Sequence, residues 1–143
     1  MTSRILIMGL PGAGKTYLAT ELIKSLDYAG KTVTWFNADN IRARYDDWDF
    51  SAAGRIRQSH RMRELADSVL GDYVVCDFVA PLPDMRDIFA AEWTIWVDTI
   101  SQGRYFDTNE LFCPPDSYHF RVTEQDATKW AGVIAAHILN SGV

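Results

Sequence analysis

Short apolar segments alternate along the chain with longer segments whose apolar residues recur every three or four positions. The short segments are rich in β-branched and aromatic residues and predict strands at residues 4–8, 32–36, 72–78, 93–97 and 118–122. The longer segments predict helices at residues 15–27, 51–70, 81–90 and 124–140. Alternating strands and helices are typical of parallel sheets with crossover helices. The pattern therefore predicts a three-layer α/β/α fold around a mostly parallel five-stranded sheet.

Two segments fall outside this alternation. Polar residues follow residues 32–36 at once, and they predict a loop directly after the second strand. Residues 99–117 show little periodicity and contain Gly103, Pro114 and Pro115, so they predict a mobile loop or lid with about one helical turn. The chain has no internal repeat, linker or low-complexity segment, and we expect residues 1–143 to form a single domain.

The helix predicted at residues 51–70 carries two polar residues on its apolar side. Ser51 is a favourable N-cap, and the apolar stripe of the helix, continued toward its start, meets Arg55 and Gln58. Polar groups on an inward face are costly unless a ligand or partner contacts them. We therefore expect this end of the helix to face a binding site.

Composition limits the location and the partners. The formal net charge of −5 makes the surface repel long nucleic acids and anionic membranes. Cys76 and Cys113 form no C-x-x-C pair, which suits a reducing compartment. No apolar run approaches a membrane span, and the first residues lack the layout of a signal peptide. We expect a cytoplasmic protein with small-molecule partners and no membrane contact.

The strongest chemical signal follows the first predicted strand. Residues 9–16, GLPGAGKT, have the spacing G-x-x-x-x-G-K-S/T between a strand and a helix, which indicates a phosphate-binding loop (P-loop). Glycines let backbone N–H groups face the phosphates, the lysine neutralises the β- and γ-phosphates, and the hydroxyl binds Mg²⁺. The sequence therefore predicts a P-loop NTP hydrolase or kinase fold that uses ATP and Mg²⁺. The predicted cofactor-binding residues are Gly9, Leu10, Pro11, Gly12, Ala13, Gly14, Lys15, Thr16 and Tyr17.

Two aspartates follow predicted strands and suit phosphoryl transfer. No N-K-x-D motif is present, so a kinase is favoured over a GTP switch. Asp39 is a candidate for orienting or deprotonating the acceptor and for the metal site, with helix N-cap as the alternative role. Asp77 is a candidate for contacting Mg²⁺ through water, together with Thr16, and its alternative role is turn formation. Ligands of open parallel sheets lie at the carboxyl ends of strands, where both aspartates are expected.

Arginines and aromatic residues provide candidates for acceptor binding. Arg42 and Arg55 are the members of a basic segment that we expect to bind an anion, whereas Arg57 and Arg63 suit a solvated helix face. Phe50 lies in a segment that faces the predicted site, where an aromatic ring can stack on a base.

Five stretches resemble the adenylyl-sulfate (APS) kinase family, which transfers the ATP γ-phosphate to the 3′-hydroxyl of adenosine 5′-phosphosulfate. GLPGAGKT looks like its phosphate loop, and NADNIR (37–42) is similar to its D-G-D-N-V-R segment. FSAAGRIRQSHRM, from residue 50, looks like a segment that begins F-S and continues through D-R-x-E-N-x-R-R. FVAP (78–81) resembles F-I-S-P, and WVDT (96–99) resembles F-V-D-T. The resemblance covers most of residues 5–100.

This resemblance implies an adenylyl-sulfate kinase-like function in sulfate assimilation, with a homodimer as the suggested assembly. It implies Lys15 and Asp39 as catalytic residues, with Arg104 as the single lid arginine. The implied substrate-binding residues are Asp39, Arg42, Phe50, Arg55, Gln58, Phe78 and Val79.

The chain also departs from the family pattern. Gln58 stands where the family has asparagine, Pro83 and Asp84 replace tyrosine and arginine, and the lysine-rich lid with F-T-G-I-D-D-P-Y is not recognisable in a shorter segment. These departures bear on the identity of the acceptor more than on the type of reaction. The alternatives are a nucleotide, nucleoside or 5′-hydroxyl polynucleotide kinase, and a non-catalytic ATP-binding regulatory module.

Overall fold

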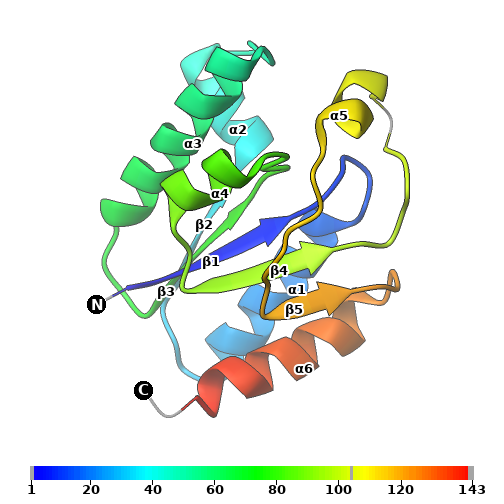
Figure 1. Cartoon of the computed structure of the whole chain (residues 1–143). Coiled ribbons are helices and arrows are strands. Elements are labelled where there is room, and N and C mark those ends of the chain that lie inside the picture. Colours follow the sequence, from blue (N-terminus) through cyan, green and yellow to red (C-terminus); the bar gives the residue numbers. More distant parts are fainter. Residues whose placement is uncertain (1, 104, 142–143) are drawn as a thin grey trace.

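Five parallel strands form the central sheet of the computed structural model, which describes residues 2–103 and 105–141 (Figure 1). The strand order is β2-β3-β1-β4-β5, and all four neighbouring pairs are parallel. The strands are β1 (Ser3–Met8), β2 (Val33–Asn37), β3 (Tyr73–Asp77), β4 (Trp93–Val97) and β5 (Phe120–Val122). The predicted strands are thus confirmed.

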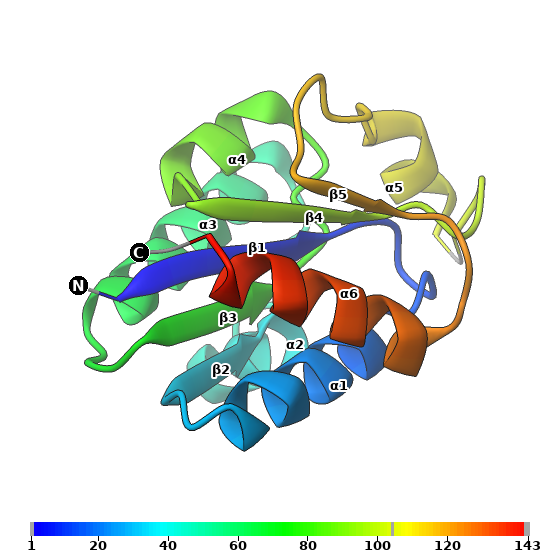
Figure 2. The same cartoon turned by 90° about the horizontal axis from the view of Figure 1, so that it is seen from below.

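Helices cover both faces of the sheet, which confirms the predicted three-layer α/β/α architecture. One face carries α1 and α6, which pack against each other, and the opposite face carries α2, α3 and α4 (Figures 1 and 2). The helices are α1 (Lys15–Tyr28), α2 (Ala38–Tyr45), α3 (Ala52–Asp67), α4 (Pro83–Phe89), α5 (Phe106–Leu111) and α6 (Ala127–Leu139). No helix in the described part of the chain is both long and apolar enough to cross a membrane.

The central strand β1 is apolar from Ile5 to Met8, because both faces of this part of the strand are buried. Ile5 and Ile7 belong to the core under α1 and α6, whereas Leu6 and Met8 belong to the core under α3 and α4. Alternate residues of a strand point to opposite faces, so where both faces are covered by helices consecutive residues are apolar.

The loop predicted directly after the second strand is wrong, because that segment forms α2. Its N-cap is Asn37, whose side chain accepts a hydrogen bond from the backbone N–H of Asn40 at 3.1 Å. Asp39 therefore lies in the first turn and is not the cap. The helix has eight residues and buries only Ile41 and Arg42, which is too little for an apolar periodicity.

The start of α3 agrees with its prediction. The Ser51 side chain caps the helix by accepting from the backbone N–H of Gly54 at 3.2 Å. Arg55 and Gln58 are buried on the inward side of the first turns, as the stripe predicted.

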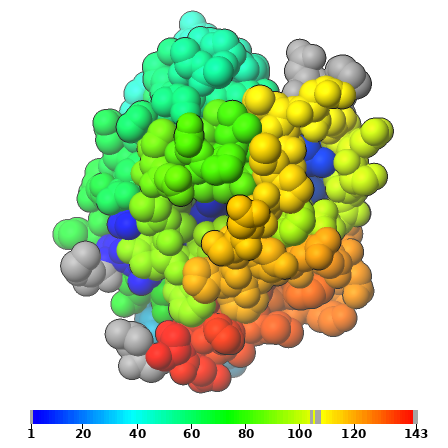
Figure 3. All heavy atoms as spheres, in the orientation of Figure 1, coloured from blue at the N-terminus to red at the C-terminus, as the bar shows by residue number. Residues whose placement is uncertain are grey.

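The segment between β4 and β5 forms the helix α5 and then returns beside α4 toward β5 (Figure 1). On this face the chain that follows α5 lies against α4 (Figure 3). The backbone N–H of Cys113 donates to the carbonyl oxygen of Pro81 at 2.7 Å. The Arg86 side chain donates to the carbonyl oxygen of Cys113 and lies over the Phe112 ring, 5.5 Å from its centroid. These contacts anchor the C-terminal part of the predicted lid on the helical layer.

Candidate functional site

The phosphate-loop sequence forms the connection between β1 and α1. Gly9 has a φ of 151°, and a Cβ atom there would lie 2.5 Å from the carbonyl oxygen of Val97. Gly14, the residue before α1, has a φ of 104°, in the left-handed region that glycine adopts without strain. Glycine is therefore required at Gly9 by close packing on β4 and at Gly14 by the backbone turn into the helix.

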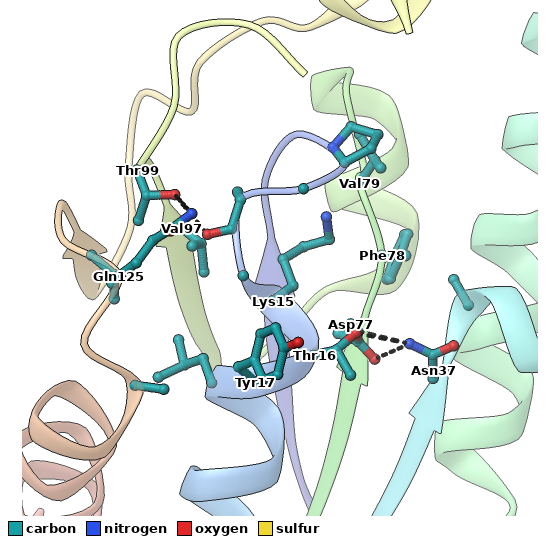
Figure 4. Close-up of a pocket in the computed structure, with 18 of the residues that line it drawn as sticks. Lys15, Thr16, Tyr17, Asn37, Asp77, Phe78, Val79, Val97, Thr99 and Gln125 are labelled. Atoms are coloured by element: carbon teal, nitrogen blue, oxygen red, sulfur yellow. Dashed lines mark hydrogen bonds between the residues drawn. The ribbon is translucent and has the colours of Figure 1, made fainter. Parts of the chain in front are cut away.

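Lys15 extends from the start of α1 along this loop (Figure 4). Its ammonium group donates to the carbonyl oxygens of Gly9 at 2.9 Å and Leu10 at 3.0 Å. A second hydrogen bond joins the loop to the segment that follows β4, because the Thr99 hydroxyl donates to the carbonyl oxygen of Ala13 at 2.6 Å. Thr99 in turn accepts from Gln125 Nε2 at 3.5 Å. The loop is thus held in a defined shape with a cation at its inner side.

Asp77 is a buried carboxylate at the end of β3 that accepts hydrogen bonds from three side chains. Trp35 Nε1 donates to Oδ1 at 2.8 Å, and the Thr16 hydroxyl donates to Oδ2 at 3.4 Å. Asn37 Nδ2 donates to Oδ2 at 3.0 Å and to Oδ1 at 3.3 Å (Figure 4). Burial raises the pKa of Asp77 to about 6, because desolvation outweighs these hydrogen bonds and the nearby charge of Lys15.

This raised pKa predicts a pH-dependent stability difference between the parent protein and an Asp77→Asn variant. Between the ordinary pKa of 3.8 and the folded value of about 6, the folded state keeps a proton that the unfolded state has lost. The parent's free energy of unfolding therefore falls across this window as the pH rises, by up to about 3 kcal/mol, whereas asparagine does not titrate. Urea unfolding of both proteins at several pH values should show that the free energy of unfolding of the parent falls relative to that of the variant as the pH rises. A pH-independent difference would contradict the prediction.

The chemistry of Thr16 and Asp77 fits a Mg²⁺ ion that is held mainly by phosphates and water. Among the described residues, no group of three or more His, Cys, Asp or Glu side chains could hold a metal ion. Mg²⁺ in phosphotransferases needs only one or two protein ligands, since substrate oxygens and water complete its octahedron. A hydroxyl oxygen and a carboxylate oxygen 3.4 Å apart beside the phosphate loop meet that need.

One cavity of about 1250 Å³ joins the phosphate loop to the residues predicted for the acceptor. At one end it runs between α1 and the segment that follows β5, and at the other end it reaches Trp48, Phe50 and Arg55. The predicted site residues that line it are Pro11, Gly12, Ala13, Gly14, Lys15, Thr16, Tyr17, Asp39, Phe50, Arg55, Asp77, Phe78 and Val79. A second cavity of about 60 Å³ lies beside it and is lined by Arg42 and Gln58 as well as Asp39 and Phe50. The structure therefore brings Asp39 and Arg55 to the same side of the sheet as the loop.

Phe50 lies against two buried guanidinium groups at the acceptor end. The Arg42 guanidinium carbon is 4.3 Å from the Phe50 ring centroid, and that of Arg55 is 5.4 Å away. Arg42 Nη1 donates to the carbonyl oxygens of Asp47 and Asp49, which shapes the loop that carries Phe50. About half of Phe50 is exposed, so the ring presents a flat apolar surface backed by positive charge.

Arg55 also links this end of the site to α5. Its Nε donates to the carbonyl oxygen of Phe50 at 2.9 Å, and its Nη2 donates to the hydroxyl of the buried Thr108 at 3.1 Å. The α5 helix is thereby held over the acceptor end. Arg104, the predicted lid arginine, lies outside the described residues.

Gln58 is engaged inside the protein at both ends of its amide. Its Nε2 donates to the carbonyl oxygen of Ala38 at 3.2 Å, and its Oε1 accepts from Arg61 Nη1 at 2.8 Å. Only 3% of the residue is exposed. In the structure it is hydrogen-bonded to the first residue of α2. Its predicted contact with substrate stays a prediction.

Sequence reasoning missed Trp35 and Asn37 as members of the site. A tryptophan within an apolar strand, such as Trp35, gives no signal in the sequence beyond that of a core residue. For Asn37 a signal was present, because NADNIR begins with asparagine where the similar D-G-D-N-V-R segment begins with aspartate. That difference places an amide, which can both donate and accept hydrogen bonds, at the end of β2.

A comparison with protein families assigns this site. The sequence model of the adenylylsulphate kinase family matches residues 1–99, which hold the phosphate loop, Asp77 and the Phe50 region. The chain belongs to the adenylylsulphate kinase family. As a member of this family it is a phosphotransferase, an ATP-dependent kinase of small molecules. Membership confirms the predicted resemblance and favours the kinase over the non-catalytic module.

Solved structures of P-loop kinases share the fold of this adenylylsulphate kinase family member. The Mycobacterium tuberculosis APS kinase CysC, in complex with AMPPNP and APS, has a TM-score of 0.83 at 18% identity, with 97% of this chain and 98% of that chain covered. Shikimate kinase from Acinetobacter baumannii, in complex with shikimate, has a TM-score of 0.66 at 16% identity, covering 100% and 96%. A gluconokinase from Sinorhizobium meliloti 1021 has a TM-score of 0.59 at 13% identity, covering 99% and 98%. The search of curated protein sequences finds no match.

Proposed function

We propose that this protein transfers the γ-phosphate of ATP, with Mg²⁺, to the 3′-hydroxyl of adenosine 5′-phosphosulfate (APS), a reaction of sulfate assimilation. The observation that carries the proposal is the continuous cavity that joins the phosphate loop, Asp39 and the Phe50–Arg55 region. Its volume of about 1250 Å³ exceeds the roughly 300–1,000 Å³ of a cavity for one small molecule. Space for a nucleotide donor and a nucleotide-sized acceptor supports transfer between two nucleotides.

The nucleotide donor takes the end of the cavity at the phosphate loop. Backbone N–H groups of residues 9–16 and the start of α1 bind the phosphates, and the adenine lies toward Gln125 and Thr128. Lys15 exchanges its two carbonyl partners for phosphate oxygens. Thr16 and Asp77 would hold Mg²⁺, which would supply neutralisation of the charge on the phosphates.

The acceptor takes the end at Phe50. Its adenine stacks on the exposed Phe50 ring, and Arg42 and Arg55 provide positive charge for the phosphosulfate. Asp39 accepts the proton of the 3′-hydroxyl as that oxygen bonds to the γ-phosphorus, while the bond from this phosphorus to the β–γ bridging oxygen breaks and ADP leaves. The chain thus supplies positioning, charge neutralisation and one proton acceptor. The complex of the M. tuberculosis APS kinase CysC with AMPPNP and APS supports this pairing of ligands.

A panel of acceptors tests the proposal directly. We expect labelled ATP with Mg²⁺ to label APS with a kcat/KM at least about 100-fold above that of the other acceptors. A site built to bind the phosphosulfate loses binding energy with acceptors that lack this group. The panel includes nucleoside monophosphates, nucleosides and a 5′-hydroxyl oligonucleotide. Preferential labelling of any of these would replace APS as the acceptor. Binding of ATP with no labelling of any acceptor would overturn the proposal.

A further inference from the structure

Asn37 makes hydrogen bonds from both ends of its side-chain amide to two different parts of the site. Its Oδ1 accepts from the backbone N–H of Asn40 at 3.1 Å, which caps α2. Its Nδ2 donates to both carboxylate oxygens of Asp77, at 3.0 and 3.3 Å, and lies 3.5 Å from Thr16 Oγ1. A backbone N–H only donates and an ionised carboxylate only accepts, so the partners fix which end of the amide is oxygen and which is nitrogen.

The sheet brings Asn37 and Asp77 together. In the parallel pairing of β2 with β3, Asn37 is the register partner of Asp77, and both are the last residues of their strands. Trp35, two residues earlier on the same strand, donates to Asp77 from the same face. The amide and the indole together fix the rotation of the carboxylate so that Oδ2 faces Thr16 (Figure 4).

The oxygen end of the Asn37 amide contacts α2, the helix that carries Asp39. By capping α2, Asn37 fixes the first turn of that helix, and Asp39 lies in this turn, exposed to both cavities. One side chain therefore contacts the phosphate side through Asp77 and Thr16 and sets the helix turn that carries Asp39. An error of about 1 Å between such groups is enough to cost two orders of magnitude in rate.

We propose that Asn37 is a positioning residue that fixes the Thr16–Asp77 pair and the Asp39 turn relative to each other. The inference rests on the proposed function for the roles of Asp39 and Asp77. It requires an amide, because an aspartate at residue 37 would cap α2 but would place a second carboxylate at hydrogen-bond distance from Asp77. A serine would cap α2 and would be too short to reach Asp77.

Three variants separate the cap from the link. Asn37→Ser keeps the cap and removes the link, Asn37→Asp keeps the cap and replaces the link by repulsion, and the exchange Asn37→Asp with Asp77→Asn restores one carboxylate and one amide. We expect each single change at residue 37 to lower kcat/KM by about 10- to 100-fold, as loss of a group that orients a ligand does. The exchange should recover most of the loss suffered by Asn37→Asp. Asn140→Asp, at the far end of α6, is the control for the added charge.

A second readout is independent of transfer. We measure two quantities, the affinity for Mg²⁺ with ATP and the free energy of unfolding without ligands. Their values for the parent, Asn37→Asp, Asp77→Asn and the exchange give the coupling between residues 37 and 77. A favourable coupling in both quantities supports the inference, even if no acceptor is labelled and the proposed function fails. Full activity of Asn37→Ser, or effects of Asn37→Asp and Asp77→Asn that simply add, would overturn it. If Asn37→Asp does not fold, Asn37→Ser alone decides.

Discussion

Replacing Lys15 by alanine is expected to lower kcat for phosphoryl transfer by about 1,000-fold, the scale of losing one preorganised group that stabilises transition-state charge. In the structure its ammonium group lies beside the carbonyl oxygens of Gly9 and Leu10, at the inner side of the phosphate loop. No other lysine lies in the first turn of α1. The γ-phosphate would therefore lose the positive charge that Lys15 supplies.

The fold should survive the Lys15→Ala change. Lys15 is half-buried and lies outside both hydrophobic cores, and its two hydrogen bonds to carbonyl oxygens are each worth about 1 kcal/mol. Steady-state kinetics with ATP and APS measure the effect, and thermal unfolding checks the fold. Lys129→Ala on the exposed side of α6 is the matched control and should keep the parent's rate. Turnover by Lys15→Ala equal to that of the parent would remove the proposed role.

The strands and the phosphate loop could be predicted from sequence because their residues face a single, strong constraint. Ile5, Leu6, Ile7 and Met8 are all buried between two helical layers, so an apolar run identifies the strand. By contrast, α2 could not be predicted from periodicity. Asp39 in its first turn lines the cavity, and Arg42 binds the loop before α3. Only Ile41 and Arg42 of the helix are buried.

The convergence of Asp39 and Arg55 with the loop could be predicted because the carboxyl ends of parallel strands meet at one edge of the sheet. The contacts of Asp77 with Trp35 and Asn37 could not. They depend on β2 pairing with β3 in one register, and neither strand order nor register is contained in the pattern of a single strand. The site's hydrogen bonds thus follow from topology, while its charged residues follow from the motif.

Replacing Asp39 by asparagine is expected to lower kcat by about 100- to 10,000-fold, the range for loss of a general base. Asp39 is exposed in the first turn of α2 and lines both cavities, between the phosphate loop and Phe50. Asparagine keeps the size of the side chain and removes its ability to take a proton. Because a negative charge at a helix N-terminus is worth about 0.3–1 kcal/mol, the loss in stability should be small.

The kinetics of Asp39→Asn distinguish proton transfer from binding. A fall in kcat with an unchanged KM for APS indicates a role in the transition state, whereas a rise in KM with an unchanged kcat indicates ground-state binding and contradicts the proposed base. Asp46→Asn is the matched control, since it makes the same change at the other end of α2. Residue 46 has a φ of 49° and a ψ of 47°, a left-handed conformation that asparagine adopts readily, so that variant should keep both the fold and the rate.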